Sequence, residues 1–220
     1  MIRMLLLLLG TLSFGVTTTP AATPRKVVVF GDSITAGSAL PEDQRDKVWV
    51  KLVESSSKGE LSMINEGKGG RPTDSVTEFE AMLKRHPKAD LLVIALGMND
   101  SRDITPGCVP KAMANVRAMI EKARKAYGDK LPVLLVGPSN INKAALGPTK
   151  PIGDQREAKL KEEGAAFEKL GIELQADYIS LFGVVSEASL LKDGVHPDVA
   201  GNEAIAKVLG AKLRVMVDAK

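Results

Sequence analysis

The stretch Val27–Gly37, VVVFGDSITAG, joins an apolar run to a glycine and a small polar cluster. The run Val27–Phe30 is rich in β-branched residues and lies between Pro24 and Gly31, which is typical of a buried strand. Ser33 follows directly at the end of this strand. Taken alone, its hydroxyl suits two roles equally well, the N-cap of a following helix or a nucleophile. The choice between them depends on the rest of the chain.

Apolar runs alternate with helical patterns along the chain. Helices are expected around 48–53, 73–86, 109–127, 154–170 with Gly171 as the stop, and 197–217. Further strands are expected at 61–65, 91–96, 131–136 and, as a short fifth candidate, 172–174. Strands separated by helices predict a parallel sheet covered on both faces, a three-layer α/β/α sandwich. Because the chain shows no repeat or linker, residues 23–220 are expected to form a single domain.

The N-terminus has the pattern of a secretory signal peptide. Arg3 precedes an apolar segment, 4–16, and small, turn-prone residues follow it over 17–24. The apolar segment is short for a membrane span, which needs about 20 residues. We therefore expect a signal peptide over 1–22, cleaved after Ala21 or Ala22, and a periplasmic or secreted protein without a stable membrane anchor. An uncleaved anchor is the alternative. Since no cysteine follows the segment, a lipid anchor is not expected.

Composition excludes several classes of protein. Apolar residues make up 44% of the chain and the formal net charge is +3, as in an ordinary globular domain. No block of Lys and Arg interleaves with aromatic residues, so no nucleic-acid partner is expected. Cys108 is the only cysteine and can form no disulfide within the chain. It is expected to be a small filler residue in a loop. Oligomeric state has no signature in the sequence.

Unusual residues follow three of the predicted strands: 31–33 (Gly-Asp-Ser), 69–70 (Gly-Gly) and 97–100 (Gly-Met-Asn-Asp). Each cluster alone fits a turn or a helix cap. However, the carboxyl ends of parallel strands meet at one edge of a sheet, where ligands bind in such folds. The repetition therefore predicts a site at this edge.

A serine nucleophile needs a general base, and the chain contains two histidines. His86 ends a charged helical segment and is expected to be a solvated helix terminus. His196 precedes the last helix and follows Asp193 by three residues. Asp193 would hold the Nδ1–H, which leaves Nε2 to take the serine proton. The alternative for His196 is a role in capping the last helix. Asp198, a competing carboxylate, is expected to serve the helix backbone instead.

Attack of a serine on an ester creates an oxyanion that needs donors already in place. Three groups at the predicted edge suit this role: the backbone N–H of Ser33, the N–H of Gly70 and the side-chain amide of Asn99. A glycine lets the backbone approach the substrate oxygen closely. An asparagine supplies a neutral donor that keeps its protonation state as the pH changes.

Four segments, in chain order, resemble the four blocks of the SGNH (GDSL-type) hydrolases: 31–35 (GDSIT), 65–70 (NEGKGG), 97–100 (GMND) and 193–197 (DGVHP). The resemblance covers nearly the whole chain after residue 22. It implies a flavodoxin-like, five-stranded parallel sheet in the order 2-1-3-4-5. The segment 64–73 is similar to the second block of the bacterial arylesterase and acyltransferase branch, and the carbohydrate acetylesterases are another near branch.

The resemblance also implies roles for individual residues. Ser33 would be the nucleophile, His196 the base and Asp193 its orienting carboxylate, with Gly70 and Asn99 as oxyanion donors beside the Ser33 N–H. Two departures from the family pattern bear on these roles. Ile34 replaces the family's leucine, and the second block has three glycines, so Gly67 or Gly69 could replace Gly70 as donor. Arg71 is expected on the surface, with orientation of a substrate as the alternative.

The predicted function is hydrolysis of short acyl esters, of acetyl type, through an acyl-enzyme, with no metal or organic cofactor. Acetylated saccharides and simple aryl or alkyl esters are both suitable substrates. Lysophospholipid or acyl-thioester hydrolysis is an alternative, although the irregular stretch 139–153 lacks the large apolar residues of a long acyl groove. A silent glycan-binding module would not need Ser33, Asp193 and His196 together. A phosphate- or nucleotide-binding loop at 31–35 is disfavoured by Asp32 and by the missing lysine.

Overall fold

A computed structural model describes residues 23–147 and 152–218, so the predicted signal peptide over 1–22 lies outside the described residues. Its sheet is parallel throughout and has the strand order β2-β1-β3-β4-β5. The strands are β1 (Arg25–Gly31), β2 (Leu61–Gly67), β3 (Leu91–Ala95), β4 (Val133–Gly137) and β5 (Asp177–Ser180). This architecture confirms the predicted α/β fold and its order.

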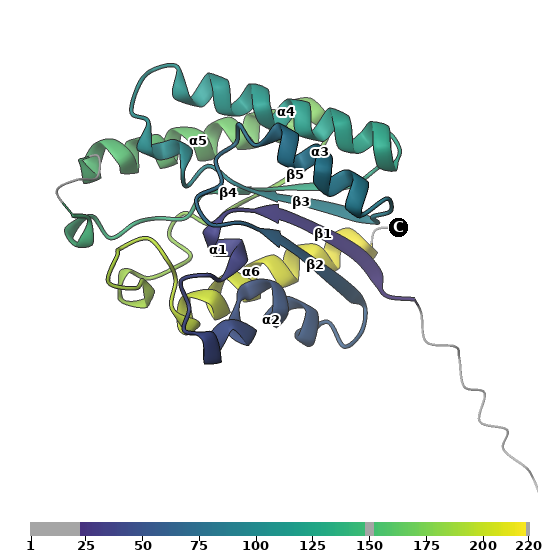
Figure 1. Ribbon diagram of the computed structural model, residues 1–220, viewed down its shortest axis with the longest axis horizontal. Helices are drawn as coiled ribbons and strands as arrows, with labels where there is room; N and C mark the ends of the chain where they lie inside the picture. Colours follow the sequence, from purple (N-terminus) through teal and green to yellow (C-terminus); the bar gives the residue numbers. More distant parts are fainter. Residues whose placement is uncertain (1–22, 148–151, 219–220) are drawn as a thin grey trace, which may run out of the picture.

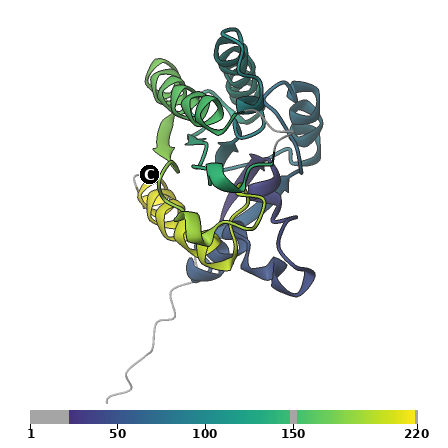
Figure 2. The same cartoon turned by 90° about the vertical axis from the view of Figure 1, so that its left-hand side faces the viewer.

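Helices cover both faces of the sheet, which gives the three layers seen in Figures 1 and 2. One face carries α3 (Val76–Arg85), α4 (Cys108–Tyr127) and α5 (Gly153–Leu174), and the other carries α1 (Ser33–Ala36), α2 (Trp49–Ser56) and α6 (Val199–Asp218). Short 3₁₀ helices lie in the connections at Glu42–Lys47, Asp100–Arg102, Lys143–Ala145 and Glu187–Ser189.

The central strands are apolar without interruption because both of their faces are buried. In β1, Val27 and Val29 pack in the core on the side of α2 and α6, while Val28 and Phe30 pack in the core under α3, α4 and α5. All four side chains are fully buried. The strand that precedes Ser33 is thereby held rigidly from both sides.

The fifth strand lies later in the chain than predicted. Helix α5 runs through Gly171 and includes 172–174, and Ile172 is 77% exposed. The helix ends instead at Gln175, which adopts a left-handed conformation with φ +51°. A Cβ at Gly171 would lie 3.0 Å from the carbonyl oxygen of Ala176, so this glycine allows a close approach of the chain rather than ending the helix. The strand is 177–180.

Cys108 was predicted to lie in a loop, but it is the first residue of α4 and is buried. Its thiol donates to the carbonyl oxygen of Asp100 (3.2 Å). Burial raises the pKa of the Cys108 thiol to about 11. A thiol with so high a pKa carries little thiolate at neutral pH, so its role is in packing.

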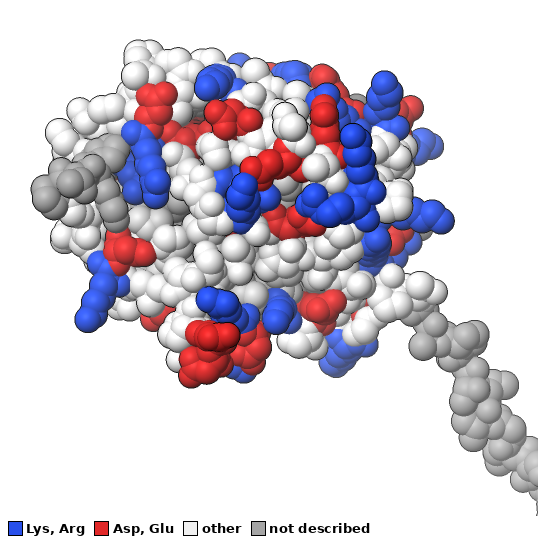
Figure 3. All heavy atoms as spheres, viewed as in Figure 1, with Lys and Arg blue, Asp and Glu red and all other residues white. Residues whose placement is uncertain are grey.

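The surface carries both signs of charge. Lys/Arg and Asp/Glu side chains are interspersed over the face in Figure 3. Within 23–147 and 152–218, no helix combines the length and the apolar character that a membrane crossing requires.

Candidate active site

Ser33 is the first residue of α1 and is buried at the carboxyl end of β1. The preceding residue, Asp32, is the N-cap of this helix, and its carboxylate accepts a hydrogen bond from the N–H of Ile34 (2.9 Å). The hydroxyl of Ser33 is therefore not the cap. Burial raises the pKa of the Asp32 carboxyl to about 6.

Asp193 and His196 lie in a tight loop between β5 and α6. The N–H of Leu191 donates to the carbonyl of His196 (2.7 Å), and the N–H of Gly194 donates to that of Leu191 (2.8 Å). Inside this loop, Asp193 Oδ1 accepts from the N–H groups of Val195 (2.9 Å) and His196 (3.0 Å). The backbone of the loop thus holds the carboxylate in one orientation.

The structure brings Ser33, His196 and Asp193 into one hydrogen-bonded chain. Asp193 Oδ2 lies 2.6 Å from His196 Nδ1, and His196 Nε2 lies 2.8 Å from Ser33 Oγ. Because an ionised carboxylate can only accept, Nδ1 carries the ring proton and Nε2 accepts from the Ser33 hydroxyl. Partial burial opposes ionisation of Asp193, but its hydrogen bonds from His196 and Val195 outweigh it and lower the pKa of this carboxyl. His196, held by Asp193, can therefore accept a proton from the Ser33 hydroxyl.

The segment after His196 is anchored to the start of α6. Asp198 Oδ1 accepts from the N–H of Gly201 (2.8 Å), so it serves the helix backbone. Buried Asn202 donates to the carbonyls of Pro197 (3.2 Å) and Asp198 (2.9 Å) and accepts from the N–H of Trp49 (3.1 Å). No motif in the sequence marks Asn202. Its position three residues before Ile205, a buried residue of α6, is the pattern that indicates a core-facing side chain.

The three glycines after β2 have different surroundings. The N–H of Gly67 donates to Asn65 Oδ1 (2.9 Å), and a Cβ at Gly67 would lie 2.3 Å from the backbone nitrogen of Ala36. Gly67 therefore packs against α1, and its N–H already has an acceptor. Gly69 and Gly70 lie on the exposed side of the same connection.

Gly69 and Gly70 form the centre of a turn that the N–H of Arg71 closes onto the carbonyl of Lys68 (3.3 Å). Gly70 has φ +73°, a conformation that favours glycine over residues with a side chain. The turn requires glycine at this position and leaves the backbone open to the edge of the sheet.

Asn99 lies in the connection after β3, beside this turn. One N–H of its side-chain amide donates to the carbonyl of Arg71 (3.1 Å), and Nδ2 carries a second hydrogen. The next residue, Asp100, accepts from the N–H (3.0 Å) and the hydroxyl (2.6 Å) of Thr73. The connections after β2 and β3 are thereby tied together.

Arg71 is buried, with 6% of its surface exposed, so the predicted surface position is wrong. Its guanidinium donates to the carbonyls of Gly31 and Glu66 and to the carboxylate of Glu78, and lies over the Phe30 ring. The carbonyls at the ends of two strands attract a side chain that the local sequence places on the surface. Its position directly after the second motif block, within the segment 64–73, was the only sequence signal.

The prediction that His86 is a solvated helix terminus is wrong. Its Nε2 lies 2.6 Å from Glu66 Oε1, its carbonyl accepts from the Tyr127 hydroxyl (2.6 Å), and its side chain is only 21% exposed. The end of α3 is thus attached to β2 and α4. His86 takes no part in the hydrogen-bonded chain of Ser33.

Two buried ionisable residues on α5 were not anticipated. Arg156 donates to the Ser101 hydroxyl (3.1 Å) and the Met98 carbonyl (3.0 Å), on either side of Asn99. Glu163 is fully buried and lies 3.8 Å from Cys108 Sγ. Both fall on the stripe of α5 residues that faces the core, together with Leu160, Phe167 and Leu170. That helical spacing was the signal available in the sequence.

Glu163→Gln is expected to stabilise the protein above neutral pH. Burial, helped by the charge of Asp100, raises the pKa of Glu163 from 4.5 to about 9. The folded state therefore holds a proton that the unfolded chain releases, and the free energy of unfolding falls as the pH rises between these values. Glutamine removes this dependence, and Tm should increase by about 2–4 °C for each kcal/mol recovered.

Thermal unfolding of Glu163→Gln and the wild type between pH 5 and pH 9 measures this effect. The difference in Tm should widen with pH. Glu168, an exposed residue on the same helix, replaced in the same way, is the matched control and should show no such trend. A difference for Glu163→Gln that does not depend on pH would contradict the expectation.

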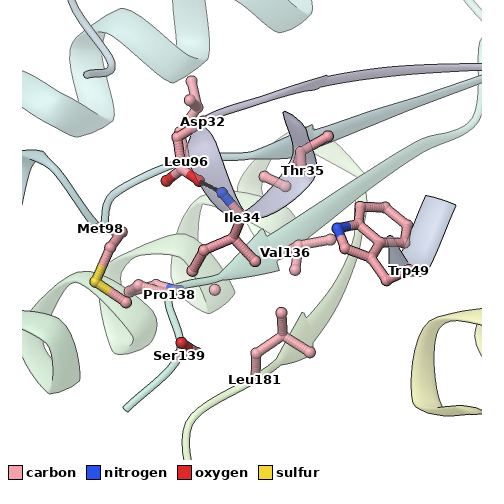
Figure 4. A pocket seen from close by; sticks show the side chains of 12 residues that line it. Asp32, Ile34, Thr35, Trp49, Leu96, Met98, Val136, Pro138, Ser139 and Leu181 are labelled. Atoms are coloured by element: carbon pink, nitrogen blue, oxygen red, sulfur yellow. Dashed lines mark hydrogen bonds between the residues drawn. The ribbon is translucent and has the colours of Figure 1, made fainter. Parts of the chain in front are cut away.

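The space beside the hydrogen-bonded chain is small. Ser33 and His196 border a hollow of about 10 Å³, together with Ile34, Leu40 and Pro197. A second, mainly apolar cavity of about 20 Å³ adjoins Ile34 (Figure 4). In that view Ile34, Trp49 and Leu181 surround the cavity, with Met98 and Pro138 at its far side. Ile34 lines both spaces.

Comparison with known proteins places the chain in a family. The model of the GDSL-like lipase/acylhydrolase family matches residues 29–204. A structure of a candidate arylesterase from Agrobacterium tumefaciens is similar at 26% identity, with a TM-score of 0.70 over 86% of this chain and 98% of that chain. A carbohydrate acetylesterase family member from Sinorhizobium meliloti has the same fold, at 20% identity and a TM-score of 0.73, over 88% and 99% of the two chains.

Among curated proteins, the uncharacterized lipoprotein YqeF of Bacillus subtilis is 35% identical over 119 residues. That match covers 50% of this chain and 46% of YqeF, so the chain spans less than half of that relative. The motif blocks, the strand order and the family match agree with one another. The chain belongs to the GDSL-like lipase/acylhydrolase family, that of the SGNH hydrolases, and is a carboxylester hydrolase.

Proposed function

We propose that the protein is an exported serine esterase that removes short acyl groups through an acyl-enzyme. The observation that carries the proposal is the chain of hydrogen bonds from Asp193 through His196 to Ser33, at 2.6 and 2.8 Å. These are the contacts that a serine nucleophile, its base and an orienting carboxylate need.

In the first half of the reaction, Ser33 Oγ attacks the ester carbonyl carbon while His196 Nε2 takes the hydroxyl proton. Asp193 keeps the imidazole in the required tautomer and stabilises the imidazolium. The tetrahedral intermediate then collapses, its bond to the alcohol oxygen breaks, and His196 returns the proton to the leaving alcohol. Water repeats the sequence on the acyl-enzyme, which releases the carboxylic acid and restores Ser33.

The oxyanion of the intermediate is assigned to three donors. The N–H of Ser33 belongs to the first turn of α1, where helix N–H groups have no acceptor within the helix. Asn99 retains a second amide hydrogen beyond its bond to Arg71. Gly70 is preferred to Gly67, whose N–H is bound to Asn65, and to Gly69, because Gly70 is adjacent to the Arg71 carbonyl that Asn99 contacts.

A short acyl group is favoured by the space at the nucleophile. The hollow of about 10 Å³ at Ser33 and His196 is close to the smallest volume that admits one water molecule. Its walls include apolar Ile34 and Leu40, and it leaves no room for a long acyl chain. The acetylesterase and arylesterase descriptions of the structural neighbours point the same way, and leave both saccharide and aryl or alkyl alcohols as leaving groups.

Export to the periplasm or the medium is part of the proposal. The apolar segment near the N-terminus has the composition of a signal peptide. A relative described as a lipoprotein supports passage across the membrane. Polymers and esters outside the cytoplasm would then be the accessible substrates.

A series of p-nitrophenyl esters tests the function. The purified protein should hydrolyse the acetate fastest, and kcat/KM should fall steadily from butyrate to octanoate because the walls around Ser33 exclude longer chains. Acetylated xylose and glucose, assayed for released acetate, test the saccharide alcohols. Equal or faster hydrolysis of the octanoate would refute the short-acyl assignment, and no hydrolysis of any ester would refute the function.

A further inference from the structure

The guanidinium of Arg71 joins the end of β1, which leads directly to the proposed nucleophile, to the end of the neighbouring strand β2. Its Nη1 donates to the carbonyl of Gly31 (2.7 Å), the last residue of β1, and to the carbonyl of Glu66 in β2. Its Nε donates to Glu78 on α3 (3.2 Å). Gly31 is separated from Ser33 by Asp32 alone, so this contact fixes the backbone that presents the Ser33 N–H.

The backbone of the same residue contacts the other two proposed oxyanion donors. The N–H of Arg71 closes the turn that contains Gly70, through its bond to Lys68 (3.3 Å). The carbonyl of Arg71 accepts from the side-chain amide of Asn99 (3.1 Å). Arg71 is thus linked directly to the chain segments of all three donors.

The Phe30 ring, 4.0 Å from the guanidinium carbon, provides a flat surface against which the side chain packs. A guanidinium is planar and presents its donors in a fixed fork, so it can meet carbonyls from two strands and a carboxylate at once. A lysine ammonium is a compact charge on a flexible stem and does not impose that geometry. The requirement is therefore for arginine, rather than for positive charge.

We propose that Arg71 is a positioning residue that sets the geometry of the oxyanion hole by holding the segments of Ser33, Gly70 and Asn99 at fixed relative positions. The proposal rests on the proposed function. The guanidinium does not take part in proton transfer, and its effect is carried by the backbone and by Asn99. Because a donor displaced by about 1 Å can cost about 10²-fold in rate, loss of this contact should appear in kcat.

Arg71→Lys and Arg71→Met test the proposal. Both are expected to lower kcat for p-nitrophenyl acetate about 10²-fold, with KM nearly unchanged. Each rate is divided by the concentration of reactive Ser33, which is measured by letting a fluorophosphonate react to completion. Unfolded molecules, which do not react, are thereby left out of kcat. Arg85→Met is the matched control: Arg85 also pairs with Glu66 (2.6 Å) but is half exposed, and its loss should leave kcat near the wild-type value.

A second measurement separates positioning from simple destabilisation. Phenyl trifluoromethyl ketone forms a hemiketal with a catalytic serine, and its oxyanion occupies the same donors as the transition state. Across the variants, its inhibition constant should rise by the same factor by which kcat/KM falls. Glu78→Gln, which loosens the guanidinium without removing it, should shift both quantities in the same direction by a smaller factor.

Three results would overturn the proposal. The first is a wild-type kcat per active serine in the Arg71 variants, or in Glu78→Gln if the Arg71 variants do not fold. The second is full activity in Arg71→Lys alone, which would assign the effect to charge. The third is a rise confined to KM, which would indicate substrate binding. If the wild type neither hydrolyses esters nor is labelled at Ser33, the proposed function fails together with the proposal for Arg71. If only the proposal for Arg71 is wrong, the wild type still hydrolyses esters.

Discussion

Ser33→Ala is expected to lower hydrolysis of p-nitrophenyl acetate by roughly 10⁶-fold, the scale seen when a serine hydrolase loses its nucleophile. The variant removes the oxygen that would form the acyl-enzyme, and His196 then has no proton to accept from residue 33. The fold should be unaffected, because the N-cap of α1 is the carboxylate of Asp32 and not the Ser33 hydroxyl. Steady-state rates and Tm together measure the two effects.

Covalent labelling gives an independent test of the same residue. A fluorophosphonate should label the wild type, and peptide mapping should place the label on Ser33. Ser57→Ala is the matched control, since Ser57 is also buried and hydrogen-bonded, to the carbonyl of Glu54 (2.6 Å), but lies at the end of α2. Near-wild-type hydrolysis by Ser33→Ala, or a label on another residue, would contradict the role of Ser33.

Asn99→Ala is expected to lower kcat for p-nitrophenyl acetate about 10²–10³-fold with little change in KM. The reason is that the amide hydrogen left over from the bond to Arg71 is assigned to the oxyanion, which exists only after attack. Asn99→Asp should be at least as impaired, because a carboxylate accepts rather than donates and repels the oxyanion. Full kinetic curves for both variants measure the separation of kcat from KM.

Asn115→Ala is the control for this prediction. Asn115 borders the same surface hollow as Asn99 and makes its own hydrogen bond, to the Thr73 hydroxyl (3.4 Å), but has no assigned role in the reaction. Its kcat should stay within a few-fold of the wild type. An effect of Asn99→Ala confined to KM would argue that the amide binds the substrate in its ground state and not the oxyanion.

Much of the candidate site could be predicted because its residues lie directly at strand ends. Once the strands are located, 31–33, 69–70 and 97–100 must share an edge, since all strands are parallel. The pairing of Asp193 with His196 is local, three residues apart in one loop, and needs little of the fold. The alternative role of Ser33 as a helix cap was open in the sequence and was decided by the neighbouring Asp32.

The error at Gly171 is local: Ala176, five residues later, passes close to it, so the glycine is needed within α5 rather than at its end. The other errors have a different physical cause, which is contact between segments distant in the chain. The charged residues around His86 predicted a solvated side chain. Its Nε2 lies instead 2.6 Å from Oε1 of Glu66, which is 20 residues away in the sequence. Arg156 and Glu163 lie in a charged helix, and their burial depends on which stripe of that helix meets the sheet.

Apolar periodicity and short motifs are properties of neighbouring residues, so they were enough to predict the layered α/β fold and to single out Ser33 and the loop of Asp193 and His196 as a candidate site. Where Arg71 points, and the fact that the N–H of Gly67 is already bound to Asn65, could be learned only from the tertiary structure. A guanidinium on a long side chain can reach solvent or two strand ends. The Arg71 side chain takes the buried position because two carbonyl acceptors, those of Gly31 and Glu66, come together when β1 and β2 are paired.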